Sequence, residues 1–383
     1  MKILVMGAGL QGAACAFDLL ENADVERVRL ADQSLDALPP FLAARRGDPR
    51  LELLTLDARE GTQVAAALAG MDGCLNALPY YFNLPITRLA IAAGCHYADL
   101  GGNTDIVFRQ AELDAEARAA GASVIPDCGL APGMVNILAA DGMAELHGTR
   151  ALRIYVGGLP KHPEPPLNYQ LVYSLEGVLD YYTSPSFILR AGRVTEVEAL
   201  SEVEPVEFGA PVGTLEAFHT AGGVSTMPWR LQGEVPTVEY KTLRYPGHAD
   251  LMRALRELGL FDLDPVSARH GEIVPREAFI AIVEPHLRRP GSPDLVALRV
   301  VVEGVRNGRD ARVSYTLLDF MDEGRGISAM QRTTGFSLSI IGQMQAGGRI
   351  AEPGVSTPDL VVPARGYLDE LARRGVSIER RVE

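Results

Sequence analysis

The sequence predicts an α/β protein with an N-terminal doubly wound parallel sheet and a second, α+β domain. Three observations predict this class. Strand-length apolar runs alternate with helical patterns over the first third of the chain, and a glycine-rich turn follows the first run. Farther along, 281–303 and 311–319 show strand-like alternation and are predicted as sheet. The chain has 383 residues, too many for one ordinary core, and we expect two domains over 1–128 and 129–327 with a C-terminal extension over 328–383.

The composition limits the class of function. Hydrophobic residues make up 47% of the chain and charged residues 22%, as in ordinary globular proteins, and no apolar run reaches the roughly 18 residues of a membrane span. The first residues lack the basic and apolar regions of an export signal. A net charge of −13 disfavours nucleic acid and anionic membranes as partners. We therefore expect a soluble, cytoplasmic protein with a small-molecule substrate.

The cysteines and histidines give no metal pattern. Cys15, Cys74, Cys95 and Cys128 lie scattered without a CxxC pair, which argues against a zinc knuckle or a disulfide framework. The histidines show no HxH or HExxH spacing. The sequence therefore predicts reduced thiols and no metal.

The first strand, turn and helix form the opening of a Rossmann domain. Lys2 to Met6 is a short apolar run, and a helical pattern follows the turn. Gly7 permits the tight turn, Gly9 lets a pyrophosphate approach the backbone, and Gly12 lets the helix pack against the strand. The helix N-terminus then faces the phosphates. The residues expected to contact the cofactor here are Gly7, Gly9, Leu10, Gln11 and Gly12.

An acid at the end of the second strand bears on the choice of cofactor. The strand over 25–31 ends at Asp32, 20 residues beyond Gly12, where a carboxylate accepts hydrogen bonds from the adenosine ribose hydroxyls. The same carboxylate repels a 2′-phosphate, and Gln33 and Ser34 supply no arginine to neutralise one. We therefore expect NAD rather than NADP.

The alternation continues to residue 126 and places polar groups at one edge of the sheet. Strands are predicted over 51–56, 73–77, 96–100 and 123–126, with helices over 62–68 and 84–93. Ligands of such sheets bind at the carboxyl ends of the strands. The residues singled out there are Asp57, Asn76, Ala77, Leu78, Asp99, Gly101 and Asp127. Asp57 is predicted near the adenine or, alternatively, as the N-cap of the next helix.

Several segments resemble, in order, those of the saccharopine dehydrogenase-like enzymes. Residues 125–136, IPDCGLAPGMVN, are similar to the segment in which that family crosses between its domains. The other similar segments are 155–160, 163–166, 173–178 and 241–248. Together with the glycine turn they span residues 1 to about 260. The resemblance implies a second domain that binds substrate and dimerises, and helices over 328–342 and 361–375 that pack back on the first domain.

Within that family the chain is most similar to the shorter NAD-dependent lysine 6-dehydrogenases. The shared segments include 76–83, 99–102 and 216–226. The resemblance implies oxidative deamination of the ε-amine of L-lysine to a semialdehyde, which cyclises to a piperideine carboxylate, with ammonia and NADH as the other products. Saccharopine reductases act on a secondary amine and carry a Ser-Tyr pair that contacts saccharopine where this chain has 99–102. That departure favours lysine.

The residues that bind the substrate follow from the chemistry of an amino acid. Its α-carboxylate is best met by the planar guanidinium of an arginine, and Arg244 is the family-matched candidate, with a surface ion pair as the alternative. Thr242 on the same strand either donates to the substrate or packs in the sheet. Tyr80, Gly101 and Glu164 are further candidates for contact with the substrate.

The base that takes a proton from the ammonium group stays open at this point. The candidates are His219, Asp127, Lys241, Asp99 and Tyr80. His219 needs little change in pKa to act near neutral pH and is slightly preferred, although a lone histidine in a glycine-rich loop is more often structural. Lys241 would need a large depression of its pKa. Asp127 alternatively fixes the nicotinamide end or the ammonium group of the substrate.

Two other functions compete with lysine oxidation. One is a saccharopine-type reductase of the same fold, and the other is a regulatory protein that binds NAD without turnover. The three functions can be told apart by the amine, if any, that reduces NAD. Because two-fold dimers are the commonest oligomers, we expect a homodimer or a higher homo-oligomer.

Overall fold

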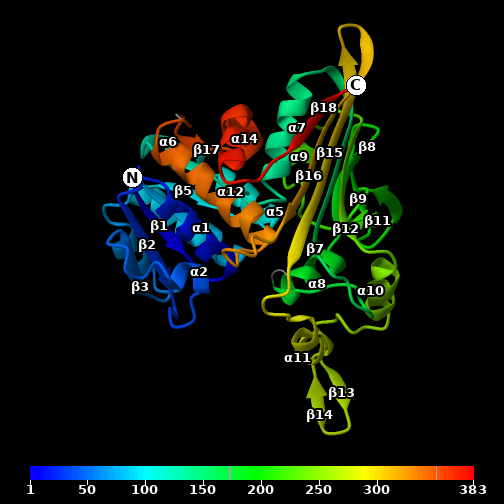
Figure 1. Ribbon diagram of the computed structural model, residues 1–383, viewed down its shortest axis with the longest axis horizontal. Coiled ribbons are helices and arrows are strands. Elements are labelled where there is room, and N and C mark those ends of the chain that lie inside the picture. Colours follow the sequence, from blue (N-terminus) through cyan, green and yellow to red (C-terminus); the bar gives the residue numbers. More distant parts are fainter. Residues whose placement is uncertain (172–173, 351) are drawn as a thin grey trace.

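The alternating strands and helices of the first 126 residues build a parallel sheet. The computed structural model describes residues 1–171, 174–350 and 352–383 (Figure 1). The strands of this sheet are β1 (Lys2–Met6), β2 (Arg27–Asp32), β3 (Leu51–Thr55), β4 (Gly73–Asn76), β5 (His96–Asp99), β6 (Ser123–Ile125) and β17 (Gly354–Val355). Their order is β17-β6-β5-β4-β1-β2-β3, and every pair is parallel. The predicted Rossmann fold is therefore confirmed.

Helices join these strands and cover both faces of the sheet. They are α1 (Leu10–Glu21), α2 (Pro40–Ala43), α3 (Gly61–Leu68), η1 (Tyr80–Phe82), α4 (Asn83–Ala92), α5 (Thr104–Ala111) and α6 (Asp114–Ala119). None of the helices in the described part of the chain is long and apolar enough to cross a membrane.

The second domain is built on a mixed, nine-stranded sheet. Its strands are β7 (His147–Pro160), β8 (Ser186–Arg190), β9 (Arg193–Val197), β10 (Glu204–Glu207), β11 (Thr214–His219), β12 (Thr237–Arg244), β15 (Asp294–Arg306), β16 (Arg309–Phe320) and β18 (Glu379–Val382). In β11 and β12, His219 lies opposite Lys241, and Phe218 lies opposite Thr242. Because side chains alternate along a strand, this register places His219 and Lys241 on one face and Thr242 on the other.

The remaining elements of the second domain are helices and one hairpin. They are α7 (Met134–Ala144), α8 (Leu175–Thr183), α9 (Met227–Arg230), α10 (His248–Glu257), α11 (Pro275–Leu287) and the hairpin of β13 (Val266–Ala268) and β14 (Gly271–Ile273), which protrudes at the bottom of Figure 1. Helix α7 packs on the sheet against β7, β15 and β16. The prediction of sheet over 281–303 is wrong for 281–287, which belong to α11. Phe279, Val283 and Leu287 recur every four residues and face one hydrophobic cluster, which is a helical period.

The C-terminal segment joins the two domains. It contains α12 (Ala329–Ala346), α13 (Pro358–Val361) and α14 (Ala364–Arg373). As the resemblance implied, α12 packs on the first domain, beside α1 (Figure 1). Gly335 makes this close approach possible, because a Cβ there would lie 2.7 Å from the carbonyl oxygen of Gln11. The last strand, β18, pairs with β16, so the end of the chain belongs to the second sheet.

Candidate active site between the two sheets

The glycine turn leaves an open cradle at the N-terminus of α1. Gly7 adopts φ 95°, and a Cβ on Gly12 would lie 1.9 Å from the carbonyl oxygen of Gly7, so both positions require glycine. Apart from its chain neighbours, no heavy atom of the described residues lies within 4 Å of where a Cβ would stand on Gly9. Gly9 is the N-cap of α1, and no side chain in the described part of the chain caps that helix. Free N–H groups beside open space fit the pyrophosphate of a dinucleotide.

A hollow of about 320 Å³ adjoins the cradle and fits the adenosine end of a dinucleotide. Asp32 lines it and accepts hydrogen bonds from the backbone N–H groups of Ala8 (2.6 Å) and Ser34 (3.2 Å). These two bonds fix the carboxylate at the end of β2. A ribose hydroxyl in the hollow would meet an oriented acceptor.

Arg59 lines the same hollow and was not among the residues predicted from the sequence. Its guanidinium forms an ion pair with Asp57 at 2.6 Å, and this interaction lowers the pKa of the Asp57 carboxyl group. Asp57 lies at the margin of the hollow. It does not cap α3, because the N-cap is Glu60 and no side chain caps that helix. The N-cap alternative for Asp57 is therefore wrong.

A second hollow, of about 280 Å³, lies between the Rossmann domain and the second sheet, and we call it the cleft. Residues from three parts of the chain line it. Those that the sequence singled out are Gln11, Leu78, Tyr80, Gly101, Thr242 and Arg244. Others that line it are Tyr181, Thr220, Tyr240 and, from α12, Met330 and Thr334. Leu78 borders both hollows, so one dinucleotide can extend from the first into the second.

Two residues of the predicted β4 loop have different surroundings. Ala77 packs against the glycine turn, where a Cβ on Gly12 would meet its side chain at 3.2 Å. Asn76 is buried, and its side-chain amide donates to Asn83 Oδ1 at 2.9 Å. Asn76 Oδ1 accepts from the Leu78 N–H at 3.3 Å. Asn76 thus shapes the loop that presents Leu78.

Asp127 follows β6 and lies beside the cleft. Its backbone adopts the left-handed region at φ 63°. The side chain is buried against Gly101, where a Cβ would lie 1.9 Å from Asp127 Oδ1. Among the described residues, neither carboxylate oxygen of Asp127 has a hydrogen-bond partner of standard geometry, although the Ser225 hydroxyl lies close enough to lower the pKa of Asp127. Burial raises the pKa of Asp127 to about 8, and the nearby Asp99 carboxylate adds to the rise. Such a group can exchange protons near neutral pH.

Asp99 holds the loops around Asp127. Its carboxylate accepts hydrogen bonds from the N–H groups of Gly101 (2.7 Å) and Asp127 (3.2 Å) and from Gln110 Nε2 (2.7 Å). It is fully buried and does not line the cleft. The structure therefore gives Asp99 a place in the framework of the site. Asp127 does not line the cleft itself, and its buried carboxylate lies directly behind Gly101, which does.

Arg244 is the last residue of β12, and its guanidinium is held from several sides. Nε donates to the Tyr182 hydroxyl at 3.2 Å, and Nη1 donates to the Leu243 carbonyl at 2.9 Å. The guanidinium carbon lies 4.8 Å from the centre of the Tyr169 ring, a cation–π distance. Two residues earlier, the Thr242 hydroxyl is 2.7 Å from that of Thr220. The period of two along β12 thus brings Thr242 and Arg244 to the cleft.

His219 and Lys241 lie on the opposite, outer face of the sheet. His219 Nδ1 is 3.2 Å from the Tyr240 carbonyl, and Nε2 is 3.2 Å from Glu202 Oε2. Burial and the charge of Lys241 lower the pKa of His219. Lys241 Nζ donates to the Glu202 carbonyl (2.8 Å) and to Glu204 Oε1 (2.9 Å). The structure does not bring these two candidate bases to the cleft.

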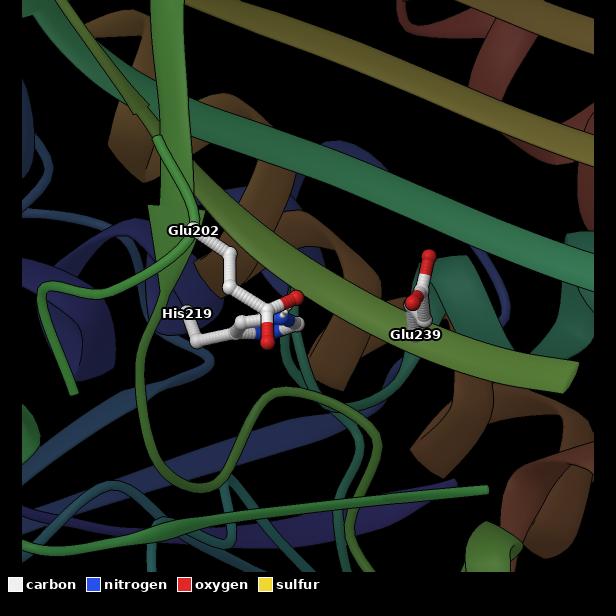
Figure 2. A group of neighbouring side chains, drawn as sticks. All are labelled: Glu202, His219 and Glu239. Atoms are coloured by element: carbon white, nitrogen blue, oxygen red, sulfur yellow. Dashed lines mark hydrogen bonds and ion pairs between the residues drawn. The ribbon is translucent and has the colours of Figure 1, made fainter. Parts of the chain in front are cut away.

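The outer face carries a group of potential metal ligands, shown in Figure 2. The ligand atoms of Glu202, His219 and Glu239 lie within 4.8 Å of one another. Arg190 forms an ion pair with Glu202 at 2.5 Å, and Arg153 lies 3.7 Å from Glu239. These cations already balance the two carboxylates, and we assign the group no metal-binding role.

Glu164 is also away from the cleft, since it forms an ion pair with Arg289 at 2.8 Å and is exposed. Tyr173, the first residue of the similar segment 173–178, lies outside the described residues. Arg59 and Thr220 are among the contributors to the site that were not predicted. Thr220 directly follows β11 and lies two positions beyond Phe218. Because side chains on one face of a strand recur every two residues, this spacing could have identified Thr220.

Comparisons with known proteins agree with this architecture. Residues 3–125 match the saccharopine dehydrogenase NADP binding domain, and residues 129–376 match the saccharopine dehydrogenase C-terminal domain. The chain is 21% identical to a saccharopine dehydrogenase (NADP+, L-glutamate-forming) of Schizosaccharomyces pombe, over all of this chain and 99% of that protein. It is 25% identical to the mitochondrial alpha-aminoadipic semialdehyde synthase of Mus musculus, over 72% of this chain and 30% of that protein.

Solved structures show the same fold. Apo saccharopine dehydrogenase (L-Glu forming) from Saccharomyces cerevisiae superposes with a TM-score of 0.80 at 21% identity, covering 100% of this chain and 99% of that one. The homospermidine synthase of Legionella pneumophila, in complex with NAD, gives 0.70 at 13% identity, covering 100% and 91%. With both of its domains matched, the chain belongs to the saccharopine dehydrogenase family, as its sequence motifs implied.

Proposed function

We propose that this protein oxidises the carbon that bears the ε-amine of L-lysine with NAD, and releases ammonia. The observation that carries the proposal is the charge of the cleft. Among the described residues that line it, only Arg244 has a positively charged side chain. One guanidinium fits the one carboxylate of lysine.

Saccharopine fits this cleft less well. It joins lysine to glutamate and so carries the carboxylates of both amino acids. In a partly buried cleft, each carboxylate without a cationic or hydrogen-bonding partner costs binding free energy. Arg244 serves one of them. The relatives nevertheless include a saccharopine dehydrogenase that aligns with the whole chain, and a saccharopine-type reaction on a secondary amine is therefore the second candidate.

The chain's own groups can bind and deprotonate a primary amine. Arg244 holds the carboxylate end, and Asp127 lies at the carboxyl edge of the Rossmann sheet, beside Gly101 of the cleft. A carboxyl group with a pKa of about 8 accepts the proton of the substrate ammonium, which frees the nitrogen lone pair. A nicotinamide held at the cleft would supply the acceptor for the hydride of the carbon that bears the amine.

Water completes the reaction on the substrate. The resulting carbon–nitrogen double bond adds water, and the proton held by Asp127 returns to the nitrogen as ammonia leaves. In total, lysine, NAD+ and water give the semialdehyde, ammonium, NADH and one proton. Asp127 ends in its starting state, as a base that serves both half-reactions must.

We further propose NAD as the preferred cofactor. Asp32 presents a fixed carboxylate in the hollow, and a 2′-phosphate beside it would be repelled. Arg59 could neutralise such a phosphate, but its guanidinium is already paired with Asp57. The matched domain is described as NADP binding, and the S. pombe relative is named for NADP+. The cofactor must therefore be tested together with the substrate.

The test is the appearance of NADH or NADPH absorbance with purified protein and lysine, ornithine or saccharopine. We expect turnover of lysine with NAD and a lower kcat/KM with NADP. Turnover of saccharopine without turnover of lysine would overturn the lysine proposal and support the second candidate. Binding of NAD with no turnover of any amine would instead indicate a protein that only senses the nucleotide.

A further inference from the structure

Behind Arg244 lies a chain of buried polar groups that the reaction itself does not use. Arg244 Nε is 3.2 Å from the Tyr182 hydroxyl, which is 3.0 Å from His248 Nε2. His248 Nδ1 is 3.0 Å from the Leu167 carbonyl oxygen. Arg244, Tyr182 and His248 are at most 4% exposed. The chain therefore runs from the cleft into the interior of the second domain.

In each hydrogen bond of this series, only one of the two groups can be the donor. The Leu167 carbonyl can only accept, so His248 Nδ1 carries the proton and Nε2 is left as an acceptor. The Tyr182 hydroxyl therefore donates to His248, and its oxygen accepts from Arg244 Nε–H. Burial and the charge of Arg244 lower the pKa of His248 to about 3, so this ring stays neutral at physiological pH.

The groups come from separate elements that converge on the end of β12. Tyr182 lies on α8, His248 begins α10, and Leu167 lies in the loop that precedes α8. The Tyr169 ring lies against the guanidinium of Arg244 at 4.8 Å. A planar cation with an aromatic ring on one face and an acceptor at Nε has its orientation set from two sides. Burying four polar groups for packing alone would cost stability that an apolar core avoids.

We propose that Tyr182 and His248 are positioning residues, which hold the Arg244 guanidinium in the orientation that binds the carboxylate of the substrate. This inference rests on the proposed function, since it assigns the carboxylate to Arg244. Its consequence is specific. Loss of the Tyr182 hydroxyl weakens recognition of the carboxylate and leaves the chemistry at the amine unchanged.

The test compares lysine with lysinamide, which keeps the ε-amine and lacks the carboxylate. We expect Tyr182→Phe to lower kcat/KM for lysine about tenfold, through KM, with kcat within about twofold. The kcat/KM for lysinamide should stay unchanged. Tyr245→Phe is the matched control, because it removes a hydroxyl that donates to the Pro160 carbonyl (3.0 Å) and does not line the cleft. It should affect neither substrate.

A double variant shows whether the hydroxyl acts through Arg244. In an Arg244→Met background, Tyr182→Phe should cause no further loss with lysine. Equal losses for lysine and lysinamide, or additive losses in the double variant, would overturn the proposal. If the wild type oxidises saccharopine and not lysine, the lysine proposal fails on its own, and the same double-variant comparison with saccharopine decides the role of Tyr182. Thermal unfolding of each variant verifies that it is folded.

Discussion

The two faces of β12 carry equally polar residues but have different roles. On the cleft face, Thr242 and Arg244 border a hollow that can admit a ligand. On the outer face, Glu239 and Lys241 lie among oppositely charged partners. His219 lies beside Glu202 there (Figure 2) and bonds to Glu202 and to the Tyr240 carbonyl. The difference teaches that residue type alone does not identify a site on a strand. Which face a side chain occupies, and whether that face borders a hollow, separates the two groups.

The largest effect is expected at Asp127, which lies behind Gly101 of the cleft on the side of the Rossmann domain. Asp127→Asn keeps the shape of the side chain and removes the base, and we expect kcat to fall by roughly 10² to 10⁴. Steady-state rates of NADH formation with lysine measure this effect. A loss of less than about threefold would show that the proton goes elsewhere and would reopen His219 and Lys241 as candidates.

Asp127→Asn should lower activity but raise the stability of the folded protein. The folded-state pKa of Asp127 is about 8, above the unfolded value of about 3.9. The folded protein therefore holds a proton that the unfolded chain has lost, and this group lowers stability progressively as the pH rises from about 4 to about 8. Asp127→Asn should be more stable than the wild type at pH 8 and nearly equal to it at pH 4. Urea unfolding at the two pH values measures this difference, and equal shifts at both would contradict it.

Arg244 comes next in expected size. Arg244→Met removes the guanidinium that the substrate carboxylate requires, and we expect kcat/KM for lysine to fall roughly 10²-fold, chiefly through KM. Arg244→Lys keeps the charge without the planar pair of donors and should recover part of the loss. An unchanged KM in Arg244→Met would show that Arg244 does not bind the carboxylate of the substrate.

Thr242 tests the same face with a smaller change. Thr242→Val keeps the shape and removes the hydroxyl that bonds to Thr220. A hydroxyl that donates to the substrate should cost about tenfold in kcat/KM, while one that only packs should cost less than about twofold. Kinetics with lysine distinguish these outcomes, which the sequence left open.

The sequence predicted most of the first domain because its signals are local. The order of strand, Gly7 to Gly12, helix and Asp32 follows from residues close together in the chain, and the structure confirms it. The cleft depends on contacts between distant segments. Asp127 meets Gly101, and Arg244 meets Tyr182, only after the chain has folded, and no local pattern states those distances. For the same reason the sequence slightly preferred His219 to Asp127 as the base.

The smallest effect on activity is expected on the outer face, and it is the sharpest test of the comparison. Lys241 Nζ donates to the Glu202 carbonyl and to Glu204 Oε1. Lys241 does not line the cleft. Lys241→Met should therefore change kcat/KM for lysine by less than about threefold. It should lower the free energy of unfolding by on the order of 1 kcal/mol, because buried hydrogen bonds are lost. Kinetics and urea unfolding on one preparation measure both values. A loss of activity comparable to that of Arg244→Met, with stability unchanged, would show that the outer face takes part in catalysis, because a lost structural contact alone would have the opposite signature.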